Sequence, residues 1–130
     1  MATTTASLTI SSGDLTGDAL SLSSTATLTK AGTTTGLDQT TGVGRILYSS
    51  AGVNTLIAHA AYTADKAHKL YIKNPSGTAA ENIVITLASQ AIGRLYAGDF
   101  ALIPWNGDTD IKVTTSDANM VVEYLLIFEA

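Results

Sequence analysis

The segment Asp18–Lys30 constrains the fold more than any other part of the chain, because apolar and hydroxyl side chains alternate along it. Leu20, Leu22, Ala26 and Leu28 share one parity, and Ser21, Ser23, Thr25, Thr27 and Thr29 occupy the other. Successive side chains of a β-strand point to opposite faces, so this period predicts a strand with one buried face and one hydroxyl-lined face in water. Leu8 and Ile10 repeat the pattern over a shorter stretch, and the glycines and aspartates of residues 13–18 predict a tight turn between the two.

The composition also favours strands over helices. Among 130 residues there are twenty threonines and eleven serines, but only three glutamates and five lysines. Helix surfaces are normally filled by long, flexible polar side chains, whereas β-branched threonine suits a pleated sheet. A hydrophobic fraction of 45% with 14% charged residues excludes a disordered chain. We therefore expect a mildly acidic, β-rich globular protein.

The rest of the chain reads as short strands separated by turns. Further strands are predicted over residues 45–49, 55–60, 69–73, 82–88, 100–105, 110–115 and 120–128. Pro104 cannot donate to a ladder and favours an edge strand, and Asn106-Gly107 is a strong hairpin signal. Residues 57–68 have helical spacing in part, and we interpret them as a strand that continues into a short turn or helix.

About nine short strands at even spacing predict a sandwich or a barrel rather than alternating strands and helices. The predicted fold is all-β: a single-domain antiparallel β-sandwich, jelly-roll-like, with about eight or nine strands over residues 1–130. Residues 1–7 are expected to form a flexible arm, and residues 31–44 a long loop rich in threonine and glycine.

Charge and residue content exclude several classes of function. The net charge of −4 argues against affinity that depends on neutralising phosphates, so no nucleic-acid partner is expected. The absence of cysteine removes Fe–S clusters, thiol nucleophiles and cysteine-based zinc sites. The apolar run 125–128 is far too short to span a bilayer, and the first basic residue, Lys30, comes too late for a secretory signal. We expect no cofactor, no metal and no membrane association.

Two groups of residues could be assembled into polar sites. His59 and His68, with Asp65 between them, have the residue types of a metal or acid–base site, but the two histidines have opposite strand parities. Asp108 and Asp110 could offer oxygens to Ca²⁺, but their spacing matches no calcium loop. We expect ordinary surface or half-buried histidines and turn aspartates.

The remaining combinations are weaker. Glu123 and Glu129 are six residues apart on one predicted strand, whereas a glycosidase pair must converge across a cleft. The stripe Lys69, Tyr71 and Lys73 has the minimum content of a nucleic-acid platform, and we interpret it as a solvated strand face. There is no nucleophile elbow, P-loop or dinucleotide fingerprint. The chain is therefore predicted not to be an enzyme.

The last predicted strand is unusual because it is apolar on both faces over Tyr124–Phe128. A half-exposed strand should have one polar face. Either this strand is central and covered on both sides, or one face contacts another protein. For a single-domain sandwich we favour the second interpretation, and we predict that Leu125 and Ile127 lie in a homo-oligomer interface.

The second half of the chain resembles a known group of proteins. The resemblance rests on Leu70-Tyr71-Ile72-Lys73-Asn74, Ile92-Gly93-Arg94-Leu95, Gly98-Asp99-Phe100, Pro104-Trp105, Asp110-Ile111-Lys112-Val113 and Val122-Glu123-Tyr124. These patterns are similar to those of small β-sandwich proteins that decorate or cement the capsids of tailed bacteriophages, commonly as trimers. The resemblance covers residues 69–130 and implies a structural virion protein, assembled in the host cytoplasm, whose partners are its own copies and the major capsid protein.

Two alternatives stay open at this point. The chain could be a tail or fibre component that contacts a host surface. It could also be a carbohydrate-binding β-sandwich module, in which Trp105, Tyr96 and Tyr71 would stack on sugar rings.

Overall fold

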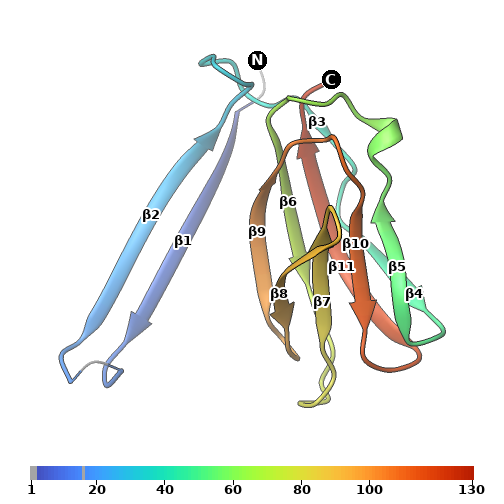
Figure 1. Cartoon of the computed structure of the whole chain (residues 1–130). Helices are drawn as coiled ribbons and strands as arrows, with labels where there is room; N and C mark the ends of the chain where they lie inside the picture. The colour runs from blue at the N-terminus through green and yellow to red at the C-terminus, as the bar shows by residue number, and fades with distance from the viewer. Residues whose placement is uncertain (1–2, 16) are drawn as a thin grey trace. The chain divides into compact units, whose positions relative to one another are not determined.

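A computed structural model describes residues 3–15 and 17–130. The chain divides into two compact units, Met1–Asp38 and Gln39–Ala130 (Figure 1). The sandwich that the sequence predicts over the whole chain is formed by Gln39–Ala130, and the first 38 residues form a unit of their own.

The first unit is a β-hairpin. Strands β1 (Thr4–Ser12) and β2 (Leu20–Leu28) pair antiparallel without a register shift, from Thr4 opposite Leu28 to Ser12 opposite Leu20. Residues 4–7 are therefore part of a fully paired strand and not of the flexible arm expected there. The pairing holds them because each of these residues has a partner across the ladder.

The two faces of the hairpin differ in character. Every odd-numbered residue of both strands is serine or threonine, whereas the even-numbered residues include all of the alanine, leucine and isoleucine side chains. The expectation of a buried apolar face is wrong here, because Leu8, Ile10 and Leu22 are 42%, 44% and 47% exposed. A two-stranded sheet has no second layer of its own to cover these side chains.

The predicted loop over residues 31–44 is held by a few specific contacts. Thr29 and Gly36 form an isolated β-bridge, Leu37 N donates to Leu28 O at 3.0 Å, and Lys30 Nζ lies 2.9 Å from Asp38 Oδ2. Strand β3 (Gln39–Thr40) then pairs with the end of the last strand of the second unit. Within residues 31–44, Gly36 lies in the bridge and Gln39, Thr40 and Gly44 lie in strands, and the other ten residues have no strand pairing.

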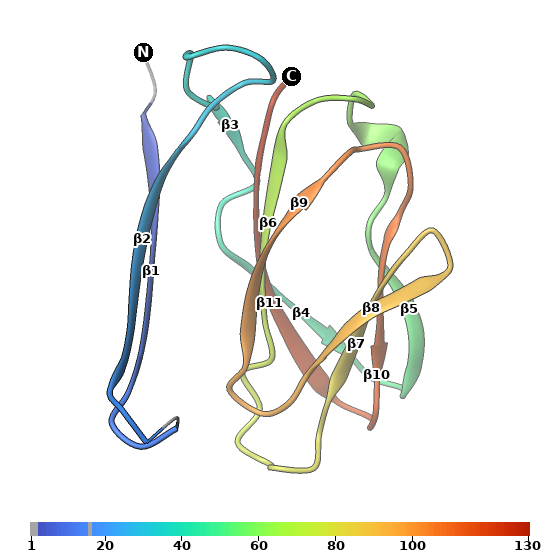
Figure 2. The same cartoon turned by 60° about the vertical axis from the view of Figure 1, so that its left-hand side comes forward.

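The second unit is a sandwich of two antiparallel sheets (Figure 2). One sheet contains β4 (Gly44–Tyr48), β11 (Met120–Phe128), β6 (His68–Lys73) and β9 (Phe100–Trp105), with β3 beside the end of β11. The other contains β5 (Gly52–Ile57), β10 (Ile111–Thr115), β7 (Ile83–Leu87) and β8 (Gln90–Leu95). The all-β antiparallel sandwich that the sequence predicts is confirmed.

The strand pairs are nested. The first of the eight main strands pairs with the last, β4 with β11; β5 pairs with β10, β6 with β9, and β7 with β8. A long hairpin in which four strands pair with the four that follow them, rolled up into two sheets, gives this nested order. It is the strand order of a jelly roll. The jelly-roll-like topology is thereby confirmed.

Two local predictions need correction. Asn106-Gly107 does form a turn, with Gly107 at φ +82°, but it joins β9 in one sheet to β10 in the other and so makes no hairpin. The sequence analysis also missed β8, whose residues are exposed except Leu95 and therefore show no alternation. By contrast, β9 pairs only with β6, so the edge position expected for Pro104 is confirmed.

The core lies between the two sheets. Leu70, Ile72, Val122 and Leu126 from one sheet have no exposed surface, and Ile83, Ile111 and Val113 from the other have none either. A 3-10 helix, η1 (His59–Ala61), follows β5, as expected from the ambiguous spacing of residues 57–68. In the part of the chain that the structure describes, no helix is long and apolar enough to cross a membrane.

Candidate interaction surface

The outward face of the sheet that contains β11 carries several exposed apolar side chains, among them Leu47, Phe100 and Leu102. The alternation along β4, β11, β6 and β9 directs every second side chain away from the core. We name these side chains the outer sheet face: Arg45, Leu47, Lys69, Tyr71, Lys73, Phe100, Leu102, Pro104, Val121, Glu123, Leu125 and Ile127.

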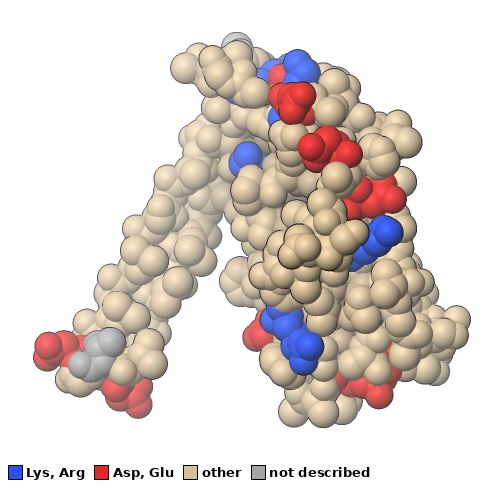
Figure 3. Space-filling model, viewed as in Figure 1, with Lys and Arg blue, Asp and Glu red and all other residues tan. Residues whose placement is uncertain are grey.

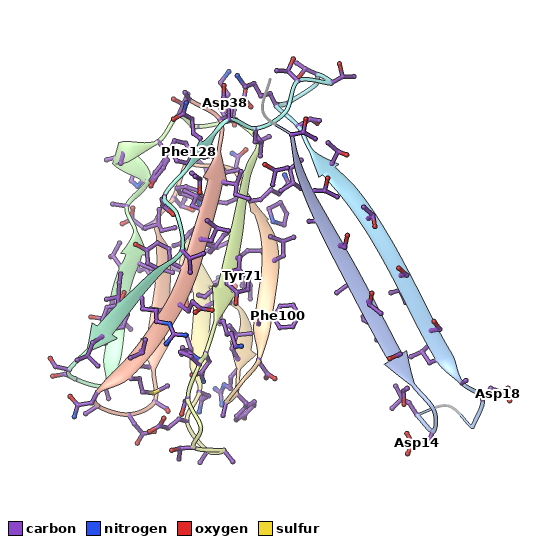
Figure 4. All side chains as sticks on the ribbon, turned by 180° about the vertical axis from the view of Figure 1, so that it is seen from behind. Asp14, Asp18, Asp38, Tyr71, Phe100 and Phe128 are labelled. Carbon is purple, nitrogen blue, oxygen red and sulfur yellow. The ribbon has the colours of Figure 1, made fainter. Side chains whose placement is uncertain are left out.

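The register sets these residues in rows across the sheet. The central row runs from Leu125 through Tyr71 to Leu102, and Ile127, Lys69 and Pro104 form the next row. Leu102 is 48% exposed and Phe100, also on β9, is 60% exposed. Figure 4 shows Tyr71 and Phe100 on this side of the sheet, with ring centroids 6.5 Å apart. The face therefore has an apolar and aromatic centre.

One polar group lies within this face. Glu123 accepts a hydrogen bond from the Tyr71 hydroxyl to its Oε2 at 2.8 Å, and from Arg45 Nε to its Oε1 at 3.0 Å. The bond from Tyr71, then the bond and charge of Arg45, lower the pKa of Glu123. Partial burial, with the Glu123 bond and charge, raises the pKa of Tyr71. The carboxylate is thus held charged and oriented within the sheet face.

The outward face of the other sheet differs in chemistry. Its rows are Thr55–Lys112–Thr86 and Val53–Thr114–Val84. Threonine and lysine suit a strand face in contact with water, and this is the alternation expected of an antiparallel sheet with one solvated side. Val53 is 66% exposed on this face, but these rows carry no leucine or aromatic side chain, in contrast to the outer sheet face.

Leu125 and Ile127, the residues predicted to form an oligomer interface, lie on the outer sheet face and are partly exposed. Strand β11 is central, since β4 and β3 pair with one edge of it and β6 with the other. Its inner side chains Val122 and Leu126 fill the core. The opposite sheet of the sandwich covers only that inner side, so a contact with another molecule through Leu125 and Ile127 stays a prediction.

The candidate polar residues are placed in separate surroundings. His59 is exposed. Its main-chain N–H donates to Asp110 Oδ1 at 2.9 Å, and the Nδ1 atom of His59 lies 2.6 Å from the same oxygen. These two bonds lower the pKa of Asp110. Asp65 Oδ1 accepts from the side-chain amide of Asn106 at 3.0 Å. No group of three or more histidines and carboxylates that could hold a metal occurs among residues 3–15 and 17–130.

His68 is fully buried, whereas the sequence analysis expected a surface or half-buried side chain. Its Nε2 donates to Thr63 O at 2.9 Å, and its Nδ1 accepts from Glu129 N at 3.3 Å. The ring packs against Trp105, with centroids 5.4 Å apart. This histidine is therefore part of an aromatic cluster in the core, held in one tautomer by the two main-chain bonds.

The carbohydrate-binding alternative loses one of its three aromatic residues. Trp105 is only 4% exposed, and its indole N–H donates to Thr109 O at 2.9 Å inside the fold. A buried indole cannot stack on a sugar ring. Tyr96 is 48% exposed, but it belongs to the turn after β8, whereas Tyr71 lies on β6.

The sequence analysis missed three members of the outer sheet face. Phe100 and Leu102 share a parity with Pro104 in β9, so their common face could have been read from the alternation. Leu47 has no such signal, because β4 is short and both of its faces carry apolar residues. The stripe Lys69, Tyr71 and Lys73 was identified, but its side chains are half-buried among these neighbours.

Neither a protein-family model, nor a curated protein, nor a solved structure matches this chain.

Proposed function

We propose that this protein is a structural component of a bacteriophage virion that decorates or cements the capsid through homo-oligomeric contacts, with a trimer as the favoured assembly. The observation that carries the proposal is the outer sheet face, where Leu125, Leu102 and Phe100 remain partly or largely exposed on a well-ordered sheet. Exposed apolar patches of this kind are typical of protein–protein contacts.

The fold is compatible with this role but does not carry it alone. Jelly rolls occur in viral capsid proteins and in lectins, and one fold can serve many functions. The resemblance of residues 69–130 to capsid decoration proteins favours the first of these two classes. The burial of Trp105 disfavours the second.

A double substitution tests the proposal. Leu125→Asp with Ile127→Asp introduces two charges on the outer sheet face and leaves the inward side chains of β11 unchanged. We expect the wild type to sediment as a closed oligomer at tens of micromolar, and the variant to sediment as a folded monomer. The matched control is Thr55→Asp with Thr86→Asp on the opposite sheet, which should leave the oligomer intact.

Attachment is measured separately. Capsids assembled from the cognate major capsid protein should retain the wild type during sedimentation and lose the double variant. A wild type that is a clean monomer at tens of micromolar would overturn the oligomer, and an oligomer that does not bind capsids would overturn the decoration role.

A further inference from the structure

The hairpin β1–β2 has an apolar side and no second layer of its own to cover it. A two-stranded hairpin alone is at best marginally stable in water, and it needs a third strand or a packing partner. Among the described residues of this unit, only Leu28, Gly36 and Leu37 are buried, all of them near the base of the hairpin. Toward the turn, Ile10 and Leu22 face one another across the ladder and both remain more than two-fifths exposed.

The chemistry of the two faces shows which one needs a partner. The odd-numbered face consists of eight hydroxyl side chains, with Ser7 Oγ 3.3 Å from Thr25 Oγ1, and these groups are satisfied in water. Covering them without new hydrogen bonds would be costly. The even-numbered face, which we name the apolar hairpin face, contains Ala6, Leu8, Ile10, Leu20, Leu22, Ala26 and Leu28. It carries no charge between its base and its turn.

The distribution of charge on the hairpin is one-sided. Asp14 and Asp18 lie at the turn, whereas the only cation of this unit, Lys30, is paired with Asp38 at the base (Figure 4). Figure 3 shows the same pattern, with acidic atoms at the turn and none along the strands. Two hairpins packed side by side in parallel would therefore bring four aspartates together.

The outer sheet face has the opposite balance. It carries three cations, Arg45, Lys69 and Lys73, and a single acid, Glu123, whose charge is already engaged by Arg45. Two such faces packed against one another would bring their cations close together. A hairpin packed on the outer sheet face avoids both repulsions, because it brings an uncharged apolar face and an acidic turn to a cationic apolar surface.

We infer that the apolar hairpin face of one copy packs on the outer sheet face of a second copy. The inference rests on the proposed function, since it names both halves of the homo-oligomeric contact. The two surfaces are different patches, so the contact is head-to-tail, and such a contact closes into a ring when its rotation allows. Each subunit of a trimer would then give one hairpin and receive one.

The first test compares two pairs of substitutions at adjacent positions of the same hairpin. Ile10→Asp with Leu22→Asp changes one cross-strand pair of the apolar hairpin face. Thr9→Asp with Ser23→Asp changes the neighbouring cross-strand pair of the hydroxyl face and adds the same charge. In sedimentation velocity at tens of micromolar, we expect the first variant to be monomeric and the second to match the wild-type oligomer. Circular dichroism should show a folded sandwich in both.

The second test mixes two defective variants of the full chain. Ile10→Asp with Leu22→Asp retains an intact outer sheet face, and Leu125→Asp with Ile127→Asp retains an intact hairpin. A head-to-tail contact predicts that the mixture forms a one-to-one complex although neither variant associates with itself. Contacts between two hairpins, or between two sheet faces, predict no complex, because each would involve one defective surface. If the Leu125 variant does not fold, the more exposed Leu102→Asp replaces it.

The outcomes separate this inference from the proposed function. A one-to-one complex in the mixture supports the hairpin contact. An oligomeric Ile10/Leu22 variant, or a mixture of monomers, overturns it while the wild-type oligomer still supports the proposed function. A wild type that is already monomeric overturns both.

Discussion

Leu125 and Leu126 are consecutive residues of β11 with opposite surroundings. Leu126 has no exposed surface and packs in the core cluster, whereas Leu125 lies across from Tyr71 on the outer sheet face and is partly exposed. One strand thus contributes to the stability of the sandwich with one side and, in our proposal, to assembly with the other.

This relationship predicts that the two leucines respond differently to truncation. Leu126→Ala should lower the free energy of unfolding by about 2–5 kcal/mol, because it leaves a cavity among buried neighbours. Leu125→Ala should cost less than about 1 kcal/mol in the monomer but weaken association. Urea unfolding at high dilution, together with sedimentation at high concentration, measures the two effects. Equal losses of stability would show that Leu125 belongs to the core.

The Tyr71–Glu123 bond predicts a dependence of stability on pH. The pKa of Glu123 is lowered in the folded state, so its contribution is fully present above its ordinary pKa of 4.5 and is lost as the pH falls through the lowered value. Tyr71→Phe removes the hydrogen bond from the Tyr71 hydroxyl, which is the largest cause of the lowered Glu123 pKa. We expect the pKa of Glu123 in this variant to move back toward 4.5, and the loss of stability on acidification below pH 4.5 to be smaller and to be complete at higher pH than in the wild type. Side-chain carboxyl NMR titration measures the first effect, and thermal unfolding between about pH 3 and 6 measures the second. An unchanged Glu123 titration in Tyr71→Phe would contradict the prediction.

Gly98 and Gly107 have similar φ angles, but we expect their replacement by alanine to destabilise the fold by different amounts. Gly98 (φ +84°) has open space where a Cβ would lie, whereas at Gly107 (φ +82°) a Cβ would come within 2.7 Å of Thr63 O and 2.8 Å of His68 Nε2. Gly98→Ala should cost about 1–3 kcal/mol from backbone strain alone. Gly107→Ala should cost at least about 1 kcal/mol more, because it also displaces the buried His68–Thr63 hydrogen bond. Chemical denaturation gives the difference, and the His68 ring NMR signals should shift only in the Gly107 variant.

The nested strand pairs predict slow folding. Strand β4 must find β11, and β5 must find β10, so most of the stabilising contacts join distant parts of the chain. Sandwiches dominated by non-local pairing fold in about milliseconds to seconds. Stopped-flow refolding monitored by the fluorescence of the buried Trp105 should show this range. A refolding phase in microseconds would mean that the transition state forms from local contacts.

The sequence predicted the strands that have one solvent-exposed side and one buried side. Alternation located β6, β7 and β10 and assigned Leu70, Ile72 and Ile111 to the core. It could not locate β8, because an edge strand exposed on nearly all its residues has no period. It also could not show that Asn106-Gly107 joins two sheets, because the turn chemistry is the same within a sheet and between sheets.

The candidate surface was predictable only in part. Leu125 and Ile127 were found because apolar residues on both parities of one strand are unusual. Their neighbours Leu102 and Phe100 lie more than twenty residues earlier, and only the β6–β9 and β6–β11 registers bring them to the same face. The buried state of His68 also depends on tertiary contacts with Thr63 and Glu129, which no local pattern of the sequence contains.

The nesting of the strands has a consequence for synthesis on the ribosome. β4 and β6 leave the exit tunnel long before β11, the strand that pairs with both, so this sheet cannot close until the last of the sandwich strands has been made. The hairpin, by contrast, has all of its ladder partners once Leu28 has emerged. For most of translation the nascent chain therefore carries one completed arm and a series of strands that await their partner. From β4 to β9 these waiting strands contain only two threonine or serine side chains, Thr55 and Thr86, so their apolar residues stay open to association with other nascent chains until β11 has emerged.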